Sequence, residues 1–316
     1  MMAIPFFRFP TTVVCIDDDE EFLSALTLKL GKKYNLKTFT DPKVALKFLN
    51  SKEASPISQI SFLKSVPELE LSHSIHHLPV DFDIKQIAKL AEQKNKYNEV
   101  AVLLLDQNMP GIKGTELCKK LENKELKKIL LTGELDHVEA IKAFNDKLID
   151  CFVQKTANNQ FLLENLLTYI DIQEEKYFIE KSAHLHNYLL SERTLPLTDR
   201  AFIDLFHRWC DHHNIREYYL VDKNGNFLLI DKDDKQFFFI IHTDNSLNTF
   251  VEPYEDDDDL TKCIQLIKDR EMMPFFGVGV DPDKVKPANW PKCLYNPQII
   301  HGSSNKIKFY WQCVPA

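Results

Sequence analysis

The first half of the chain alternates short apolar runs with segments whose apolar residues recur at helical spacing. The apolar runs lie at 12–16, 103–105, 128–131 and 150–154. They lack a regular alternation with polar residues, which is typical of strands buried on both faces of a parallel sheet. Helical spacing follows the first run through Phe22, Leu26 and Leu30, and it recurs over 42–49. Strands that alternate with helices predict an α/β fold with a doubly wound parallel sheet, which we expect to have five strands.

The second half shows a different pattern, in which aromatic and β-branched runs are separated by turn signals. Two such runs flank Asn224-Gly225, a dipeptide preferred in two-residue hairpin turns. Further strands are predicted at 236–242, 247–251, 298–302 and 307–312. One helix is predicted to begin at Thr198 as its N-cap, and another to cover 257–270. This order of elements predicts an α+β domain built on an antiparallel sheet.

Residues with reactive or metal-binding side chains stand at the C-terminal ends of the four parallel strands. Asp17 and Asp18 follow the first strand, and Asp106 follows the second, just before a Pro-Gly turn. Thr132 and Lys155 follow the third and the fourth. Because these strand ends meet at the edge where open α/β sheets bind ligands, we expect the five side chains to lie together. Clustered carboxylates are costly unless a cation neutralises them, and oxygen donors favour Mg²⁺.

This ordered set resembles the receiver domain of bacterial two-component response regulators, over about the first half of the chain. The resemblance implies that Asp106 is the phosphoacceptor and that Mg²⁺ is the cofactor. The implied metal ligands are Asp17, Asp18, Asp106 and the backbone carbonyl of Asn108, the implied catalytic residues are Asp106, Thr132 and Lys155, and the implied switch residues are Thr132 and Phe152. After phosphorylation, the Thr132 hydroxyl would turn toward the phosphoryl group and the Phe152 ring would follow it.

The chain departs from this family in two places. Thr156 follows Lys155, where the family usually has a proline held in a cis peptide bond. A cis bond to a non-proline residue costs about 3 kcal/mol, so we expect a trans or strained loop there. The connection after the second helix is also unusually long, over about 51–98, with a helix predicted at 83–91. This insertion is either a structured lid or docking surface, or an extension packed on the sheet edge.

The length of 316 residues favours two domains. We expect a receiver domain over 1–157 with the insertion at about 51–98, a helical connector over 158–190, and an α+β output or sensory domain over 191–316. The last of these resembles a PAS domain in outline only, through its opening hairpin. The helical pattern from 159 to 188 fits either one continuous helix or a receiver helix followed by a separate packing helix.

Charge and composition narrow the range of functions. The net charge is -8, and residues 182–316 carry 15 Lys and Arg against 20 Asp and Glu, which makes DNA an unfavourable partner. No apolar run is long enough to cross a bilayer, and the first residues do not resemble a signal peptide, so we expect no membrane partner. The seven cysteines are scattered and form no C-x-x-C motif, so we expect reduced thiols in a cytoplasmic protein.

Together these observations predict a response regulator that is phosphorylated by a sensor histidine kinase or a phosphotransfer protein. We expect its output to act through a downstream protein partner or by sensing a small ligand, and we expect a homodimer on phosphorylation. The second half lacks the signature motifs of cyclases, kinases and phosphatases, so an output enzyme is not expected. Two alternatives are a transcription regulator that binds DNA in an unorthodox way and an output enzyme that acts on a nucleotide.

Overall fold

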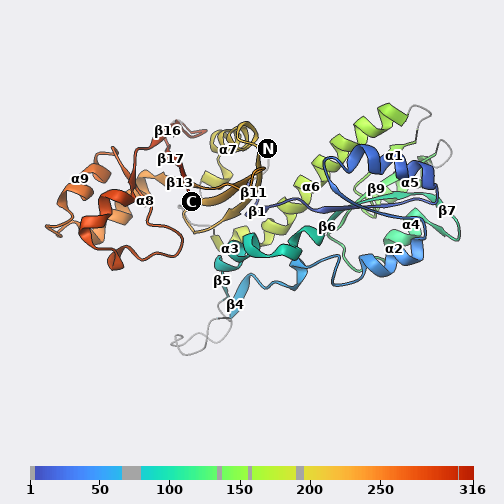
Figure 1. Cartoon of the computed structure of the whole chain (residues 1–316), viewed down its shortest axis with the longest axis horizontal. Coiled ribbons are helices and arrows are strands. Elements are labelled where there is room, and N and C mark those ends of the chain that lie inside the picture. The colour runs from blue at the N-terminus through green and yellow to red at the C-terminus, as the bar shows by residue number, and fades with distance from the viewer. Residues whose placement is uncertain (1–3, 66–79, 134–136, 156–158, 190–195, 305) are drawn as a thin grey trace. The chain divides into compact units, whose positions relative to one another are not determined.

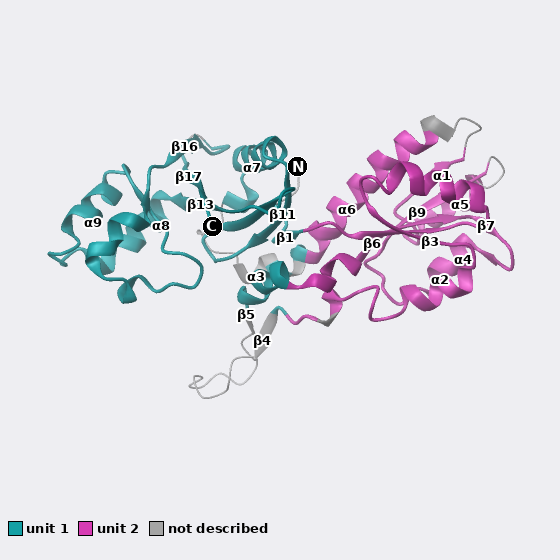
Figure 2. Ribbon diagram, viewed as in Figure 1, with its two compact units in different colours: residues 1–8, 62–92, 182–316 teal, residues 9–61, 93–181 magenta. Residues whose placement is uncertain are grey.

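The computed structural model describes residues 4–65, 80–133, 137–155, 159–189, 196–304 and 306–316. The chain forms two compact units (Figure 2). One consists of Phe9–Ser61 and Gln93–Lys181, and we call it the receiver unit. The other consists of Met1–Arg8, Phe62–Glu92 and Ser182–Ala316, and we call it the C-terminal unit.

The receiver unit is built on a five-stranded parallel sheet, as predicted. Its strands are β2 (Thr12–Ile16), β3 (Asn35–Phe39), β6 (Val100–Asp106), β9 (Lys127–Thr132) and β10 (Cys151–Gln154). They lie in the order β10-β9-β6-β2-β3, so the chain runs outward in both directions from β2 and β6. This is a doubly wound order, with its switch point between the strands that end at Asp17 and Asp106.

Helices cover both faces of this sheet (Figure 1). They are α1 (Glu20–Leu30), α2 (Pro42–Leu49), α4 (Gly114–Lys120), α5 (His137–Asn145) and α6 (Asn159–Leu189). One core cluster joins β2, β6 and β9 to α2, α4 and α5, through residues such as Leu49, Leu117 and Ala140. Strands β2, β6 and β9 are buried along their full length, which explains the near-continuous apolar runs in the sequence.

The C-terminal unit contains a six-stranded antiparallel sheet in the order β1-β11-β12-β13-β17-β16. The strands are β1 (Phe7–Arg8), β11 (Ile215–Leu220), β12 (Phe227–Asp231), β13 (Gln236–Thr243), β16 (Gln298–His301) and β17 (Lys308–Pro315). The helices are α3 (Lys85–Glu92), α7 (Arg200–His212), α8 (Asp244–Val251) and α9 (Thr261–Lys268). The predicted hairpin around Asn224-Gly225 is present as β11 and β12, but residues 221–226 join the strands in place of a two-residue turn, and Gly225 in this connection has a positive φ.

Three predictions in this unit were wrong in detail. Residues 247–251 belong to helix α8 and not to a strand, because Thr243 and Ser246 form a capping box that starts a helix directly after β13. The N-cap of α7 is Asp199 and not Thr198, since the Asp199 carboxylate accepts the N–H groups of Ala201 and Phe202. Helix α9 begins only at Thr261 and ends at Lys268, so it is shorter than 257–270.

The C-terminal unit also includes two segments that we expected in the receiver domain. Strand β1 pairs with β11, with Phe7 opposite Tyr219, and the Leu220 N–H donates to the Phe6 carbonyl at 2.7 Å. The insertion contributes the hairpin β4 (Leu63–Ser65) and β5 (Val80–Phe82), and its predicted helix is α3, which packs against β11. The Phe7 and Phe62 rings stack with centroids 5.6 Å apart. The unit boundaries therefore differ from the expected ones, because β1 pairs with β11 and α3 of the insertion packs against the same strand.

Helix α6 is one continuous helix of 31 residues, which settles the choice between a continuous helix and two separate ones. Its residues up to Lys181 belong to the receiver unit, and those from Ser182 belong to the C-terminal unit. Within the receiver unit, the Glu174 carboxylate accepts the Thr11 hydroxyl at 2.5 Å, and the Tyr177 hydroxyl donates to the buried Glu99 carboxylate. The helix is therefore fixed in register by hydrogen bonds to the residues just before β2 and β6.

Candidate functional site

Three carboxylates meet at the C-terminal ends of β2 and β6. Asp17, Asp18 and Asp106 each present one oxygen, and these oxygens all lie within 4.8 Å of one another. Asp17 and Asp106 are buried, whereas Asp18 is exposed. Because β2 and β6 are adjacent parallel strands, their paired residues Ile16 and Leu105 bring the acidic ends side by side. Within the described residues, this is the group of carboxylate, His and Cys side chains that is arranged to hold a metal ion.

Backbone groups orient each of the two buried carboxylates. The Asp19 N–H donates to Asp17 Oδ1 at 3.1 Å, and the Asn108 N–H donates to Asp106 Oδ2 at 2.7 Å. The Asp19 side chain has a separate role, since it caps α1 by accepting the N–H groups of Glu21 and Phe22. The run of three aspartates therefore divides into two candidate ligands and one helix cap.

Lys155 closes the site from the end of β10. Its Nζ lies 2.7 Å from Asp17 Oδ2 and 2.5 Å from Asp106 Oδ1, and it lies 4.8 Å from the centroid of the Phe22 ring. Burial raises the pKa of the Asp17 carboxyl, although Lys155 opposes this shift. Burial alone would lower the pKa of Lys155, but its hydrogen bonds and ion pairs with Asp106 and Asp17 outweigh this effect and raise it. The ammonium thus stays charged and balances part of the carboxylate charge.

Thr132 ends β9 and Phe152 lies in β10, and their role as switch residues stays a prediction. The Thr132 side chain is fully buried, and its Oγ1 has no hydrogen-bond partner among the described residues. A buried hydroxyl without a partner is uncommon and calls for a specific explanation. The Thr132 carbonyl accepts the Lys155 N–H at 2.8 Å, which ties the two strand ends together. The Phe152 ring is half-buried and meets the His137 ring edge-to-face, with centroids 6.5 Å apart.

The donor set suits Mg²⁺. It consists of carboxylate oxygens, which hard cations prefer, and the hydroxyl of Thr132 is available for a further acceptor. Asn108 lies in the two-residue strand β7 (Asn108–Met109) that follows Asp106, and the role of its carbonyl as a ligand stays a prediction. Thr156 lies outside the described residues. The expectation of a trans or strained peptide bond between Lys155 and Thr156 therefore stays a prediction.

Two residues next to Asp106 were missed by the reasoning from sequence. Gly114 begins α4, and a Cβ there would lie 2.4 Å from the Asp106 carbonyl oxygen, so only glycine allows this close approach. Gln107 is fully buried and bonds to several neighbouring elements. Gly114 could have been noticed in the sequence, because it is a second glycine just after the Pro110-Gly111 turn and is not needed for that turn. A buried glutamine directly after an apolar strand gave no comparable signal.

Comparison with known proteins agrees with this architecture. The family model for the response regulator receiver domain matches residues 80–167, which include Asp106, Thr132 and Lys155. The structure is similar to that of the Legionella pneumophila response regulator LqsR, with 24% identity, a TM-score of 0.76, and coverage of 99% of this chain and 89% of that chain. At this identity the similarity shows the fold.

Smaller structures match the chain over about half its length. A CheY-like response regulator receiver domain protein from Methanospirillum hungatei JF-1 matches with 19% identity, a TM-score of 0.34, and coverage of 53% of this chain and 98% of that chain. The adenylate cyclase from Rhodopirellula baltica matches with 19% identity, a TM-score of 0.37, and coverage of 55% and 95%. No curated protein matches the chain.

The described helices include none with the length and apolar character of a membrane span. The type of the C-terminal unit is not identified by these comparisons, and its PAS-like outline stays a prediction. The receiver unit has the predicted five-stranded parallel sheet, and the family model covers its strands β6, β9 and β10. On this evidence the chain contains the receiver domain of response regulators.

Proposed function

We propose that the protein is a two-component response regulator that accepts a phosphoryl group on Asp106 from a phosphohistidine of a sensor histidine kinase or a phosphotransfer protein. The observation that carries this proposal is the arrangement of Asp17, Asp18, Asp106 and Lys155, together with the buried, unpartnered hydroxyl of Thr132 at the end of the neighbouring strand β9. A solvated cap or a structural ion pair would not need a buried hydroxyl without a partner.

Phosphoryl transfer depends mainly on positioning and on neutralisation of charge. A carboxylate oxygen of Asp106 attacks the phosphorus in line, the phosphorus–nitrogen bond breaks, and the electron pair returns to the imidazole of the donor. Asp17, Asp18, Asp106 and the Asn108 carbonyl would hold Mg²⁺, which supplies positive charge opposite the phosphoryl oxygens. Lys155, which already bonds Asp106, donates to another of these oxygens.

Phosphorylation then changes the positions of the Thr132 and Phe152 side chains. The added oxygens give the Thr132 hydroxyl the partner that it lacks, and its movement leaves space for the Phe152 ring. We propose that this rearrangement promotes homodimer formation. The described residues of α5 include the exposed apolar side chains Val138, Ile141 and Phe144, close in the chain to His137, which contacts Phe152. Sedimentation with and without beryllofluoride tests this step, and identical masses over a wide concentration range would count against it.

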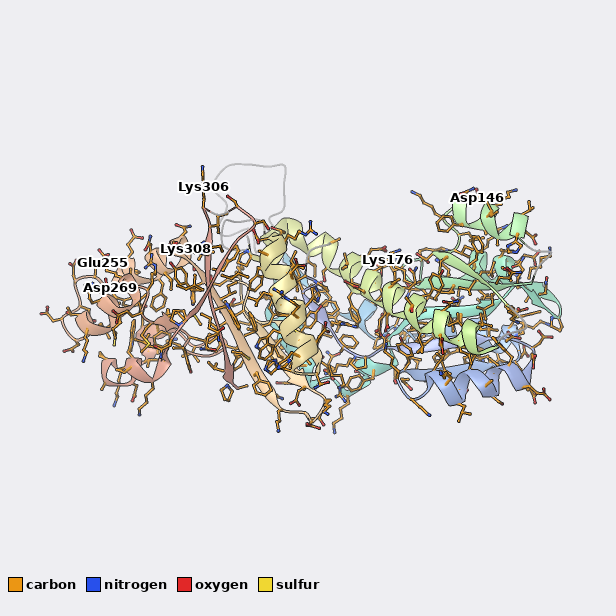
Figure 3. All side chains as sticks on the ribbon, turned by 90° about the horizontal axis from the view of Figure 1, so that it is seen from above. Asp146, Lys176, Glu255, Asp269, Lys306 and Lys308 are labelled. Carbon is orange, nitrogen blue, oxygen red and sulfur yellow. The ribbon has the colours of Figure 1, made fainter. Side chains whose placement is uncertain are left out.

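We propose that the output acts on a downstream protein or responds to a small ligand, and is not itself an enzyme. A cavity of ≈ 250 Å³ in the C-terminal unit, lined by residues that include His242, Phe250 and Tyr254, is the candidate ligand site. DNA binding is the weaker alternative, since the charge of residues 182–316 is negative and the exposed Lys306 and Lys308 (Figure 3) form only a short basic stretch in the sequence. Salt-dependent retention of duplex DNA by the full chain would favour that alternative, and turnover of nucleotides would favour an enzyme.

The direct test uses acetyl phosphate and Mg²⁺ with the full chain. The intact mass should rise by one phosphoryl group, and hydroxylamine should remove the label because it is an acyl phosphate. Asp106→Asn should abolish the label, whereas the exposed Asp146→Asn, a matched change on the same unit (Figure 3), should retain it. Label that persists in Asp106→Asn would refute the assignment.

A further inference from the structure

Gln107 directly follows Asp106, and its polar groups bond to several other elements. Its N–H donates to the Leu131 carbonyl at 2.9 Å on β9, and its carbonyl accepts the Gly114 N–H at 3.0 Å. Its side-chain Oε1 accepts the Thr115 N–H at 3.2 Å, so both bonds to Gly114 and Thr115 reach the first turn of α4. Its Nε2 donates to Glu139 Oε2 on α5 at 2.9 Å and lies 3.5 Å from Thr115 Oγ1.

The orientation of this amide is fixed by the chemistry of its partners. The Thr115 N–H can only donate, so it must face the amide oxygen of Gln107. The Glu139 carboxylate can only accept, so it must face the amide nitrogen. The side chain is fully buried, and a rotation of the amide by half a turn would place donor against donor and acceptor against acceptor. Gln107 therefore has one orientation that satisfies all its partners.

The hydrogen bonds of Gln107 lead to the two residues that phosphorylation would affect, Asp106 and Phe152. On one side, Gly114 approaches the Asp106 carbonyl so closely that no Cβ fits between them, so a shift of this loop moves Asp106 itself. On the other side, Glu139 lies in the first turn of α5, the helix that also contributes His137 against the Phe152 ring. The start of α5 thus contacts the phosphoacceptor loop through Gln107 and the expected switch ring through His137.

We propose that Gln107 is a positioning residue for phosphoryl transfer, which holds the Asp106 loop in its reactive geometry by bonding to Glu139 of α5. The inference rests on the proposed function, because it concerns transfer to Asp106. Gln107 does not touch the phosphoryl group; it acts through the backbone of Asp106 and through α5. Positioning within a fraction of an ångström is the main contribution of the protein to this kind of transfer.

An exchange of the two side chains tests the inference. Gln107→Glu places a second carboxylate against Glu139 and should slow phosphorylation by acetyl phosphate at least tenfold. In the double variant Gln107→Glu with Glu139→Gln, the new amide on α5 donates to the new carboxylate, and the other oxygen of that carboxylate still accepts the Thr115 N–H. The double variant should recover a rate within about threefold of the unmodified protein.

A matched control distinguishes the hydrogen bond between Gln107 and Glu139 from the exposed ion pair between Lys113 and Glu139. Lys113 Nζ lies 2.8 Å from Glu139 Oε2, and both side chains are about half exposed. Lys113→Met removes this ion pair and leaves the bond between Gln107 and Glu139 intact. Because exposed ion pairs contribute little, it should phosphorylate at nearly the unmodified rate. It also controls for the loss of the Lys113 pair in the double variant.

Three outcomes decide the matter. Urea unfolding without Mg²⁺ gives the folded fraction of each variant, and the rate per folded molecule, measured against acetyl phosphate concentration, gives the effect on transfer. If Gln107→Glu loses stability but its folded molecules react at the unmodified rate, Gln107 is merely structural and the inference is overturned. A double variant no faster than Gln107→Glu overturns it as well. An unmodified protein that takes no label at Asp106 refutes the proposed function instead, and the inference falls with it.

Discussion

The Nζ of Lys155 lies 2.5 Å from Oδ1 of Asp106. The same ammonium also bonds Asp17, so one cation is shared by two buried carboxylates that would otherwise repel each other. Sequence reasoning assigned Lys155 to the site and expected a trans or strained loop after it, because Thr156 replaces the proline of the family. The observed contacts place the ammonium within reach of both carboxylates.

Lys155→Met should therefore destabilise the receiver unit and make it depend on Mg²⁺. It leaves the buried Asp17 carboxylate without its cation, which should lower the free energy of unfolding by about 1–3 kcal/mol. Saturating Mg²⁺ should restore more stability to this variant than to the unmodified protein, because binding to the folded state alone shifts the equilibrium. Urea unfolding with and without Mg²⁺ measures both effects. Lys33→Met, which removes an exposed ion pair with Asp171, is the control and should show neither.

Neighbouring aspartates should respond in opposite ways to the same substitution. Asp18 is exposed and belongs to the carboxylate cluster, so Asp18→Ala should abolish Mg²⁺ binding with little change in stability. Asp19 caps α1, so Asp19→Ala should cost about 1 kcal/mol of stability while Mg²⁺ binding persists. Isothermal titration with Mg²⁺ and urea unfolding of the two variants separate these roles. Retained binding in Asp18→Ala would remove Asp18 from the ligand set.

Buried Glu99 should make stability depend on pH. Its carboxylate accepts the Ile57 N–H at 2.9 Å and the Tyr177 hydroxyl, yet burial outweighs these bonds and raises the pKa of the carboxyl. A raised pKa means that the carboxyl of Glu99 stays protonated up to a higher pH in the folded state than in the unfolded state. The stability that Glu99 contributes is therefore complete below the ordinary pKa of about 4.3 and is lost as the pH rises through the folded-state value.

Glu99→Gln removes this dependence while it keeps the shape of the side chain. The unfolding free energy of the unmodified protein should fall relative to Glu99→Gln as the pH rises above about 4.3. Unfolding followed by circular dichroism over a range of pH measures the difference. Glu122→Gln, at an exposed glutamate of the same unit, should run parallel to the unmodified protein. If the unfolding free energies of Glu99→Gln and of the unmodified protein changed with pH in the same way, the prediction would be contradicted.

The sequence allowed the receiver sheet and most of its site to be predicted, for physical reasons that particular residues illustrate. Asp17, Asp106, Thr132 and Lys155 stand at the C-terminal ends of parallel strands with apolar centres, so their meeting at one edge follows from the parallel topology alone. Gln107 was not found, because its role depends on the distant Glu139 and not on local pattern.

The errors in the C-terminal unit have two causes, one local and one in long-range packing. Residues 247–251 have the apolar side chains of a strand, but the capping box of Thr243 and Ser246 starts a helix that includes them. The first residues of the chain and the insertion precede or interrupt the receiver sequence, so adjacency in the chain suggested the wrong unit. Their packing with residues 182–316 depends on tertiary contacts such as the pairing of Phe7 with Tyr219 and the contact of α3 with β11, which no local periodicity encodes.

The N-terminal strand should therefore be essential to the C-terminal unit. Phe7 is fully buried, pairs with Tyr219 on β11 and stacks on Phe62. Phe7→Ala should lower the unfolding free energy of this unit by about 3–5 kcal/mol, through lost burial and the cavity left behind. The three tryptophans of the chain, Trp209, Trp290 and Trp311, all lie in this unit, so their fluorescence reports its unfolding selectively.

The control for this measurement is Leu28→Ala in the receiver unit, where the side chain is 74% exposed. It should leave the tryptophan transition within about 0.5 kcal/mol of the unmodified protein. If Phe7→Ala also left that transition unchanged, the Phe7 side chain would contribute nothing to the stability of the unit, and the prediction would be contradicted. If it shifts as expected, ligand, partner and DNA binding must be measured on the full chain, because residues 182–316 by themselves lack a strand of their own sheet.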